Sequence, residues 1–117
     1  KIAPYKVQCP VVIDVEKVSD SEARMNQISL EQRTANTLVF LETVEAAGYE
    51  VMLYHNMEMG TLMLDMEKFE DYSKWFAYYN KEIYYPYAFD VWQYSDKGKV
   101  DGIAGDVDLN ISFKLWD

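Results

Sequence analysis

The chain has 117 residues, 50% of them hydrophobic and 26% charged, a composition typical of one globular domain with a modest core. Its formal net charge of −9 argues against nucleic acid and against an anionic membrane surface as partners, since both attract basic proteins. No apolar run is long enough for a transmembrane helix, no signal peptide is evident, and the single cysteine, Cys9, rules out an internal disulfide. Because the chain opens on Lys1 and not on Met, we interpret it as a mature product or a piece of a longer protein.

Residues 11–16, Val-Val-Ile-Asp-Val-Glu, follow Pro10 and predict a buried strand, because the run is short, apolar and β-branched. Side chains alternate along a strand, so Asp14 and Glu16 are expected on the same side. Crowded carboxylates have pKa values that move apart, which prepares one acid and one base. The alternative is a strand end whose acids simply meet solvent.

The clearest helix is predicted over residues 29–47. Ser29 and Gln32 form a capping-box pattern, and Gly48 is suited to end the helix. The helix carries apolar residues at helical spacing: Ala35, Leu38, Val39, Leu41 and Val44. A strand is predicted at 49–56, so the order strand, helix, strand indicates a right-handed parallel crossover.

The remaining chain continues this alternation. Residues 57–72 have helical character, and further strands are predicted at 74–79, 88–94 and 107–113, with glycine-rich turns at 95–105. The pattern predicts an α/β fold with parallel strands. Only two good helices are present, although a parallel sheet needs cover on both faces, so residues 1–117 are interpreted as one partial domain.

Aromatic residues are concentrated late in the chain, with 12 of 18 lying between Phe69 and Tyr94. Aromatic faces are flat apolar platforms of the kind that sugar-binding sites use. The alternative is that Tyr and Trp fill a core while their polar ends reach the surface.

Metal and nucleophile chemistry finds little support in the sequence. His55 is the only histidine, so a histidine-based metal cluster and a Ser-His-Asp triad are not expected. Asp106, Asp108 and Asn110 resemble the start of a calcium loop, but Ile111 stands where glycine is needed. No cofactor is therefore expected. The remaining constellation, Asp14, Glu16 and Asp108 among aromatic residues, suggests glycoside hydrolysis.

Four motifs resemble the family 25 glycoside hydrolases, the Chalaropsis-type lysozymes. They occur in this order: Pro-Val-Val-Ile-Asp-Val-Glu at 10–16, Gly48-Tyr49 leading to Tyr-His-Asn at 54–56, Trp-Phe-Ala-Tyr-Tyr at 75–79, and Trp-Gln-Tyr-Ser at 92–95 followed by two glycine-containing segments at 98–103 and 105–110. The resemblance implies the C-terminal half of a modified (β/α)5(β)3 barrel, a partial TIM-like barrel. A further catalytic-site aspartate of the family lies on a first strand that has no counterpart here.

The resemblance also implies hydrolysis of the β-1,4 bond between N-acetylmuramic acid and N-acetylglucosamine in peptidoglycan. Glu16 would be the general acid, Asp14 would orient the substrate's acetamido group or a water, and Asp108 would complete the acidic floor. The residues implied to line the saccharide groove are Tyr54, Trp75, Tyr79, Trp92 and Tyr94. The parent would be secreted, associated with the cell wall, or a phage endolysin.

Two functional hypotheses remain open at this point. The chain is either half of a lysozyme, active only when joined to the N-terminal half, or a non-catalytic glycan-binding or assembly module. A half-barrel exposes strand edges and apolar surface, which predicts self-association or a tightly held N-terminal half of the same barrel.

Overall fold

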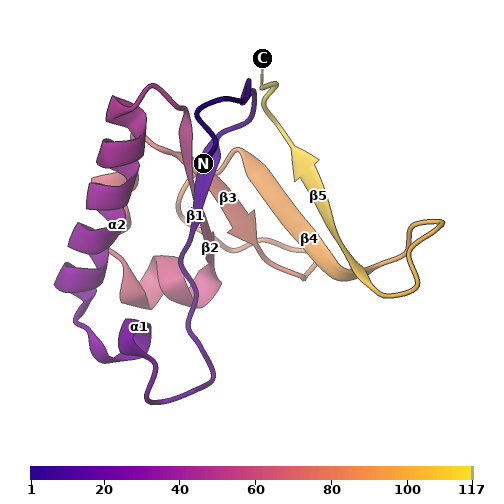
Figure 1. The fold of residues 1–117 in the computed structure, drawn as a ribbon. Coiled ribbons are helices and arrows are strands. Elements are labelled where there is room, and N and C mark those ends of the chain that lie inside the picture. Colours follow the sequence, from indigo (N-terminus) through magenta and orange to yellow (C-terminus); the bar gives the residue numbers. More distant parts are fainter. Residues whose placement is uncertain (117) are drawn as a thin grey trace.

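The computed structural model describes residues 1–116, which form a five-stranded sheet with helices on one side (Figure 1). The sheet order follows the chain: β1 (Val11–Asp14), β2 (Val51–Asn56), β3 (Ser73–Ala77), β4 (Val91–Gly98) and β5 (Val107–Ser112). Helices α1 (Arg24–Gln27) and α2 (Leu30–Ala46) separate β1 from β2, and the short helices η1 (Met59–Met63) and η2 (Met66–Phe69) separate β2 from β3. The predicted α/β fold with a partial barrel is confirmed.

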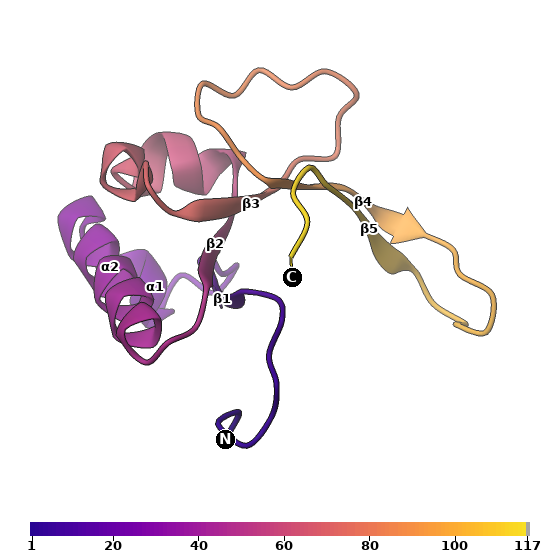
Figure 2. The same ribbon diagram turned by 90° about the horizontal axis from the view of Figure 1, so that it is seen from above.

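Strands β1 to β4 are parallel, whereas β5 runs antiparallel to β4. The expectation of parallel strands is therefore wrong for the last pair. A parallel return needs a crossover of a dozen or more residues, and the loop between Gly98 and Val107 is too short for one. The result is a hairpin that projects away from the helices (Figure 2).

Helix α2 begins and ends where the sequence predicts. The Ser29 side chain accepts a hydrogen bond from the Gln32 backbone N–H at 3.1 Å, and Gly48 has a φ of 92° just beyond the helix. Val39, one of the apolar residues at helical spacing, is 61% exposed and so lies on the solvent side. The helix instead buries a more polar face toward β1 and β2, consisting of Arg33, Thr34, Thr37 and Leu41.

The main core lies between the sheet and these helices. It consists of Val15, Leu41, Val51, Leu53, Met59, Leu64, Met66 and Phe69. The opposite face of β1 to β3 carries no helix (Figure 2). No helix in the described part of the chain is long and apolar enough to cross a bilayer.

The helical stretch predicted at 57–72 is divided into a π-helix, η1, and a 3-10 helix, η2. Gly60 in η1 lies against Tyr85, and a Cβ at this position would overlap the Tyr85 hydroxyl. Asp65 separates the two helices, and its backbone N–H donates to the Thr34 hydroxyl at 3.0 Å. Contacts with residues distant in the sequence thus accompany the break between the two helices.

Strand β4 starts later and ends later than predicted, since residues 88–90 lie outside it and residues 95–98 belong to it. The extension pairs with β5 through Ser95 opposite Leu109 and Gly98 opposite Val107, with register irregularities between the paired positions. The residues interpreted as turns are held in the strand by partners that lie nine or more positions away.

Candidate active site

The predicted acid pair lies at the carboxyl end of β1, at the edge of the sheet where functional groups of α/β barrels are found. Asp14 is the last residue of the strand and Glu16 follows it by two positions. Between them Val15 is fully buried, and its backbone N–H donates to the Tyr54 carbonyl at 3.1 Å. This bond extends the strand-like path by one residue, so Asp14 and Glu16 share the face opposite to Val15.

The three predicted acids line one cavity of about 320 Å³. Asp14, Glu16 and Asp108 come from the two outer strands of the sheet, and they are joined there by Val12, Tyr54, Trp75 and Gln93. Curvature of the sheet therefore brings together carboxylates that lie more than ninety positions apart in the sequence. A second cavity of about 290 Å³ also contains Glu16 and Tyr54, with Asn56, Glu58 and Tyr79 among its other lining residues.

The surroundings of Glu16 raise the pKa of its carboxyl group above the ordinary value of 4.5. Burial is the largest cause, followed by a side-chain hydrogen bond with Asp14 and by the negative charges of Asp14 and Asp108. A raised carboxyl pKa favours the protonated form, which is the form that a general acid requires.

Hydrogen bonds across the sheet hold the aromatic residues of the cavity. Tyr54 and Trp75 on neighbouring strands pack edge to face, with ring centroids 5.1 Å apart. The Trp75 indole N–H donates to Asn110 Oδ1 at 2.8 Å. The hydroxyls of Tyr54 and Tyr79 donate to the same acceptor, Gln93 Oε1, at 2.7 and 2.6 Å. Tyr54, Trp75 and Tyr79 thus line the cavities that contain Glu16.

Trp92 and Tyr94 do not lie in the cavities that Glu16 lines. Their rings are 5.8 Å apart, and the Trp92 indole N–H donates to the Tyr78 carbonyl at 2.9 Å. Side chains alternate along β4, so Trp92 faces away from the side that Gln93 occupies. A contact of Trp92 and Tyr94 with a saccharide therefore stays a prediction from the resemblance, outside the cavities that Glu16 lines.

Sequence reasoning missed Gln93, Asn56 and Asn110, whose amides contact the aromatic residues or line the cavities. One signal was available for Asn110, because it follows Asp108 by two positions in a strand and therefore shares its face. Gln93 had no comparable signal, since its two tyrosine partners lie on other strands.

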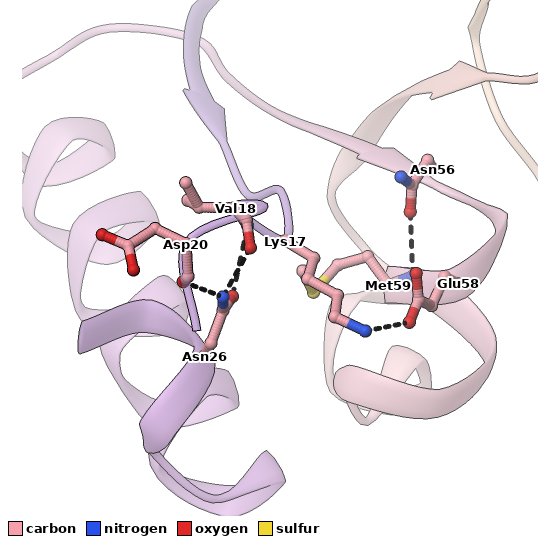
Figure 3. A network of polar contacts seen from close by, with 7 residues as sticks. All are labelled: Lys17, Val18, Asp20, Asn26, Asn56, Glu58 and Met59. Atoms are coloured by element: carbon pink, nitrogen blue, oxygen red, sulfur yellow. Dashed lines mark hydrogen bonds and ion pairs between the residues drawn. The ribbon is translucent and has the colours of Figure 1, made fainter. Parts of the chain in front are cut away.

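Polar contacts hold the loop after Glu16 against the start of η1 (Figure 3). Lys17 Nζ pairs with Glu58 Oε1 at 3.0 Å. The Asn26 amide both donates to the Val18 carbonyl and accepts from the Val18 N–H, and Asn56 Oδ1 accepts a backbone N–H of η1 at 2.9 Å. Two of these residues, Asn56 and Glu58, line the second cavity together with Glu16.

His55 lies on the other face of β2 and is not part of the site. Its Nε2 is 2.7 Å from the Tyr85 hydroxyl, and burial lowers the pKa of the imidazole to about 4. The tie fixes the loop between β3 and β4 to the outer face of the sheet.

A further cavity of about 420 Å³ lies near the start of β3, at the opposite end of the strands from Glu16, and Lys74 lines it. Lys74 is buried, and its ammonium group donates to the carbonyls of Glu70 and Tyr72 at 3.3 and 2.8 Å. This lysine closes the end of η2 and its bonds within the chain give it a structural role.

The calcium-like motif is dispersed over a hairpin. Asp108 and Asn110 lie on β5, whereas Asp106 precedes the strand and pairs with Lys99. Among residues 1–116, no group of three or more His, Cys, Asp or Glu side chains is placed to hold a metal ion.

The sequence model of the glycosyl hydrolases family 25 matches residues 1–103 of this chain. The chain belongs to glycosyl hydrolase family 25. The family that the four motifs indicated is thus confirmed.

Three relatives give the extent of the match. The uncharacterized protein YegX of Escherichia coli O157:H7 is 30% identical over 104 residues, which are 87% of this chain and 36% of that protein. A family 25 glycosyl hydrolase from Bacillus anthracis is 26% identical with a TM-score of 0.76, over 95% of this chain and 52% of that one. The CTP1L endolysin is 25% identical with a TM-score of 0.72, over 95% of this chain and 37% of that one. The chain thus spans between about a third and a half of the relatives it matches.

Proposed function

We propose that this chain carries the acid side of a muramidase active site, which cleaves the β-1,4 bond between N-acetylmuramic acid and N-acetylglucosamine in peptidoglycan. The observation that carries the proposal is a carboxyl group, Glu16, whose pKa is raised in a cavity shared with Asp14 and Asp108. Membership of a glycosyl hydrolase family supports the reaction class.

In the proposed reaction, Glu16 gives its proton to the glycosidic oxygen as the bond from that oxygen to the anomeric carbon breaks. Positive charge then develops on the anomeric carbon and the ring oxygen, and the negative charges of the Asp14 and Asp108 carboxylates stabilise it. Asp14 orients either the acetamido group of the substrate or the water that attacks. Water finally supplies the hydroxyl on the anomeric carbon and returns a proton to the site.

The aromatic residues of the cavity would hold the sugar. Trp75 and Tyr54 are fixed by edge-to-face packing, and Trp75 is further fixed by Asn110, so little side-chain entropy remains to be lost when a sugar ring packs on them.

The site is proposed to be complete only when the chain is joined to the rest of a family 25 barrel. Strand β1 pairs with β2 alone, so the edge beside Asp14 is free within the described sheet. Below the acids lies an apolar hollow of about 260 Å³ whose lining includes Val12, Met52, Trp75 and Val91. We propose that N-terminal strands of the same barrel cover this hollow and supply the missing aspartate. The whole protein would then act on the wall from outside the cell or as an endolysin.

Release of soluble fragments from purified cell walls by the full-length parent tests the proposal. Glu16→Gln should lower the rate at least about 100-fold, because general acid catalysis contributes that much or more. Glu42→Gln, an exposed carboxylate on α2, is the matched control and should leave the rate unchanged. An active Glu16→Gln parent would refute the acid assignment.

A non-catalytic glycan-binding module is the alternative, in which the aromatic residues beside the cavities bind a glycan and Glu16 transfers no proton. It predicts that the parent is retained on insoluble peptidoglycan without releasing new reducing ends. Wild-type parent that binds walls but releases no fragments would establish that alternative.

A further inference from the structure

Gln93 is a polar side chain, only 3% exposed, that joins two strands of the candidate site. Its Oε1 accepts the hydroxyls of Tyr54 on β2 and Tyr79, which follows β3, at 2.7 and 2.6 Å. These distances are typical of O–H···O hydrogen bonds and short for bonds that involve an amide nitrogen. The carbonyl end of the amide therefore faces both tyrosines.

This arrangement keeps both hydroxyl protons within the group formed by Gln93, Tyr54 and Tyr79. A tyrosine hydroxyl has one proton to donate and a carbonyl oxygen has two lone pairs, so Gln93 Oε1 can accept both protons, and the two tyrosines also hydrogen-bond each other. Burial raises the pKa of Tyr54 and of Tyr79, so both hydroxyls stay protonated at working pH. Toward the cavity the two hydroxyls present lone pairs only.

The direction matters because Tyr54 and Tyr79 line the same cavity as Glu16. A hydroxyl proton donated to a carboxylate stabilises its charged form. The charged neighbours of Glu16 are the acids Asp14 and Asp108, while Lys17 at the cavity end is paired with Glu58. With both tyrosine protons committed to Gln93, nothing in this set offsets the acidic surroundings of Glu16.

We infer that Gln93 is a positioning residue that keeps the two tyrosine protons away from Glu16 and makes the tyrosine pair a hydrogen-bond acceptor for the hydroxyl or amide N–H groups of a bound sugar. The direction of the hydrogen bonds stands independently of the reaction. Its value for catalysis rests on the proposed role of Glu16.

The test is an NMR titration of the Glu16 side-chain carboxyl in the 117-residue chain, which needs no enzymatic activity. Gln93→Leu removes the acceptor and frees both hydroxyl protons, so the Glu16 titration midpoint should fall by about one pH unit. The triple variant Gln93→Leu, Tyr54→Phe, Tyr79→Phe has no hydroxyl to donate and should restore the midpoint. Gln32→Leu on α2, whose amide donates to Asn36, is the control and should leave the midpoint unchanged.

A midpoint that Gln93→Leu leaves unchanged, or that the triple variant fails to restore, would overturn the inference. Tyr54→Phe and Tyr79→Phe in the native background keep Gln93 and therefore test the same point if Gln93→Leu does not fold. Neither should move the midpoint, and a rise in either variant would mean that the hydroxyls already donate to Glu16.

A second readout uses the parent enzyme. A general acid must be protonated, so a lower Glu16 pKa should move the alkaline limb of kcat/KM to lower pH in Gln93→Leu. A parent without any wall-solubilising activity would defeat the proposed function, yet the titration result for Gln93 would still stand.

Discussion

The side chains on the two faces of β2 differ in their surroundings and in their roles. Val51, Leu53 and His55 point toward the helices and the outer loop, where they are buried. Met52, Tyr54 and Asn56 point to the open side and line the cavities. His55 and Tyr54 are adjacent, and each is tied to a distant residue by one hydrogen bond, His55 to Tyr85 and Tyr54 to Gln93. The bond of His55 fixes a loop to the face of Val51, Leu53 and His55, which we call the sealed face. The bond of Tyr54 orients a side chain of the candidate site on the face of Met52, Tyr54 and Asn56, which we call the open face.

The two faces also shift the pKa values of their titratable groups in opposite directions. Burial on the sealed face lowers the pKa of His55, while partial burial among acids on the open face raises the pKa of Glu16. In both groups the shift in pKa favours the neutral form. On the sealed face the neutral imidazole avoids a buried charge, and on the open face the raised pKa of Glu16 supports the general-acid role that we propose.

Truncating the sealed face should have the largest effect. Phe76 is fully buried and stacks on Tyr85 with centroids 4.1 Å apart. Phe76→Ala should lower the free energy of unfolding by about 3–5 kcal/mol in chemical denaturation. Phe113→Ala, a truncation of an exposed phenylalanine, should cost less than about 1 kcal/mol. Similar losses of stability in the two variants would show that the packing of Phe76 on the sealed face is no more important than an exposed side chain.

The second effect is a pH dependence that His55 imposes on stability. The unfolded imidazole takes a proton near pH 6.5, whereas the folded one resists until pH about 4. The unfolded state therefore binds more protons in this interval, so stability is full above pH 6.5 and is lost as pH falls toward 4, by at most about 3 kcal/mol. His55→Gln should flatten the slope in urea unfolding measured across this range. An equally steep slope in His55→Gln would assign the dependence to other groups.

A smaller effect is expected when the hydroxyl partner of His55 is removed. Tyr85→Phe keeps the ring stack but leaves a buried imidazole nitrogen without its bond, which should cost about 1–3 kcal/mol. Tyr84→Phe removes a hydroxyl that donates to Glu82 at the surface and should have almost no effect. Equal stabilities of the two variants would show that the His55–Tyr85 bond contributes nothing.

The open face should show the opposite sign. Because the folded pKa of Glu16 is raised, the folded state binds the proton more tightly, and this contribution is lost as pH rises through the folded pKa. Glu16→Gln should therefore stabilise the chain slightly at pH 7, by less than about 1 kcal/mol because the group is largely solvated, and should make no difference below pH 4. Destabilisation at pH 7 would mean that Glu16 serves the fold and not the chemistry.

The smallest effect is expected at the exposed Lys17–Glu58 pair. Glu58→Gln should change stability by no more than about 0.5 kcal/mol, since exposed ion pairs contribute little. A loss above 1 kcal/mol would show that the loop after Glu16 depends on this pair.

The sequence was sufficient for features that depend on neighbours along the chain. Ser29 and Gly48 mark the ends of α2 by local hydrogen bonding and backbone conformation, and strand alternation placed Asp14 beside Glu16. The four motifs identified the family and, with it, the approach of Asp108 to the acid pair.

Features that depend on pairing between distant strands could not be derived in this way. Trp92 and Gln93 are adjacent, and only the register of β4 against β3 decides which of them faces the cavity. Gln93 acquires its role from Tyr54 and Tyr79, at 39 and 14 positions away. The antiparallel hairpin likewise depends on the length of one loop, which outweighs the general pattern of parallel strands.

The central claim is that the acidic, partly buried surroundings of Glu16 raise the pKa of its carboxyl group. The direct measurement is the Glu16 titration midpoint in the wild-type chain and in the variants Asp14→Asn and Asp108→Asn. We expect a wild-type midpoint above 4.5 that falls in both variants, with the larger fall in Asp14→Asn because that residue contributes a hydrogen bond as well as a charge. A wild-type midpoint at or below 4.5 would contradict the account.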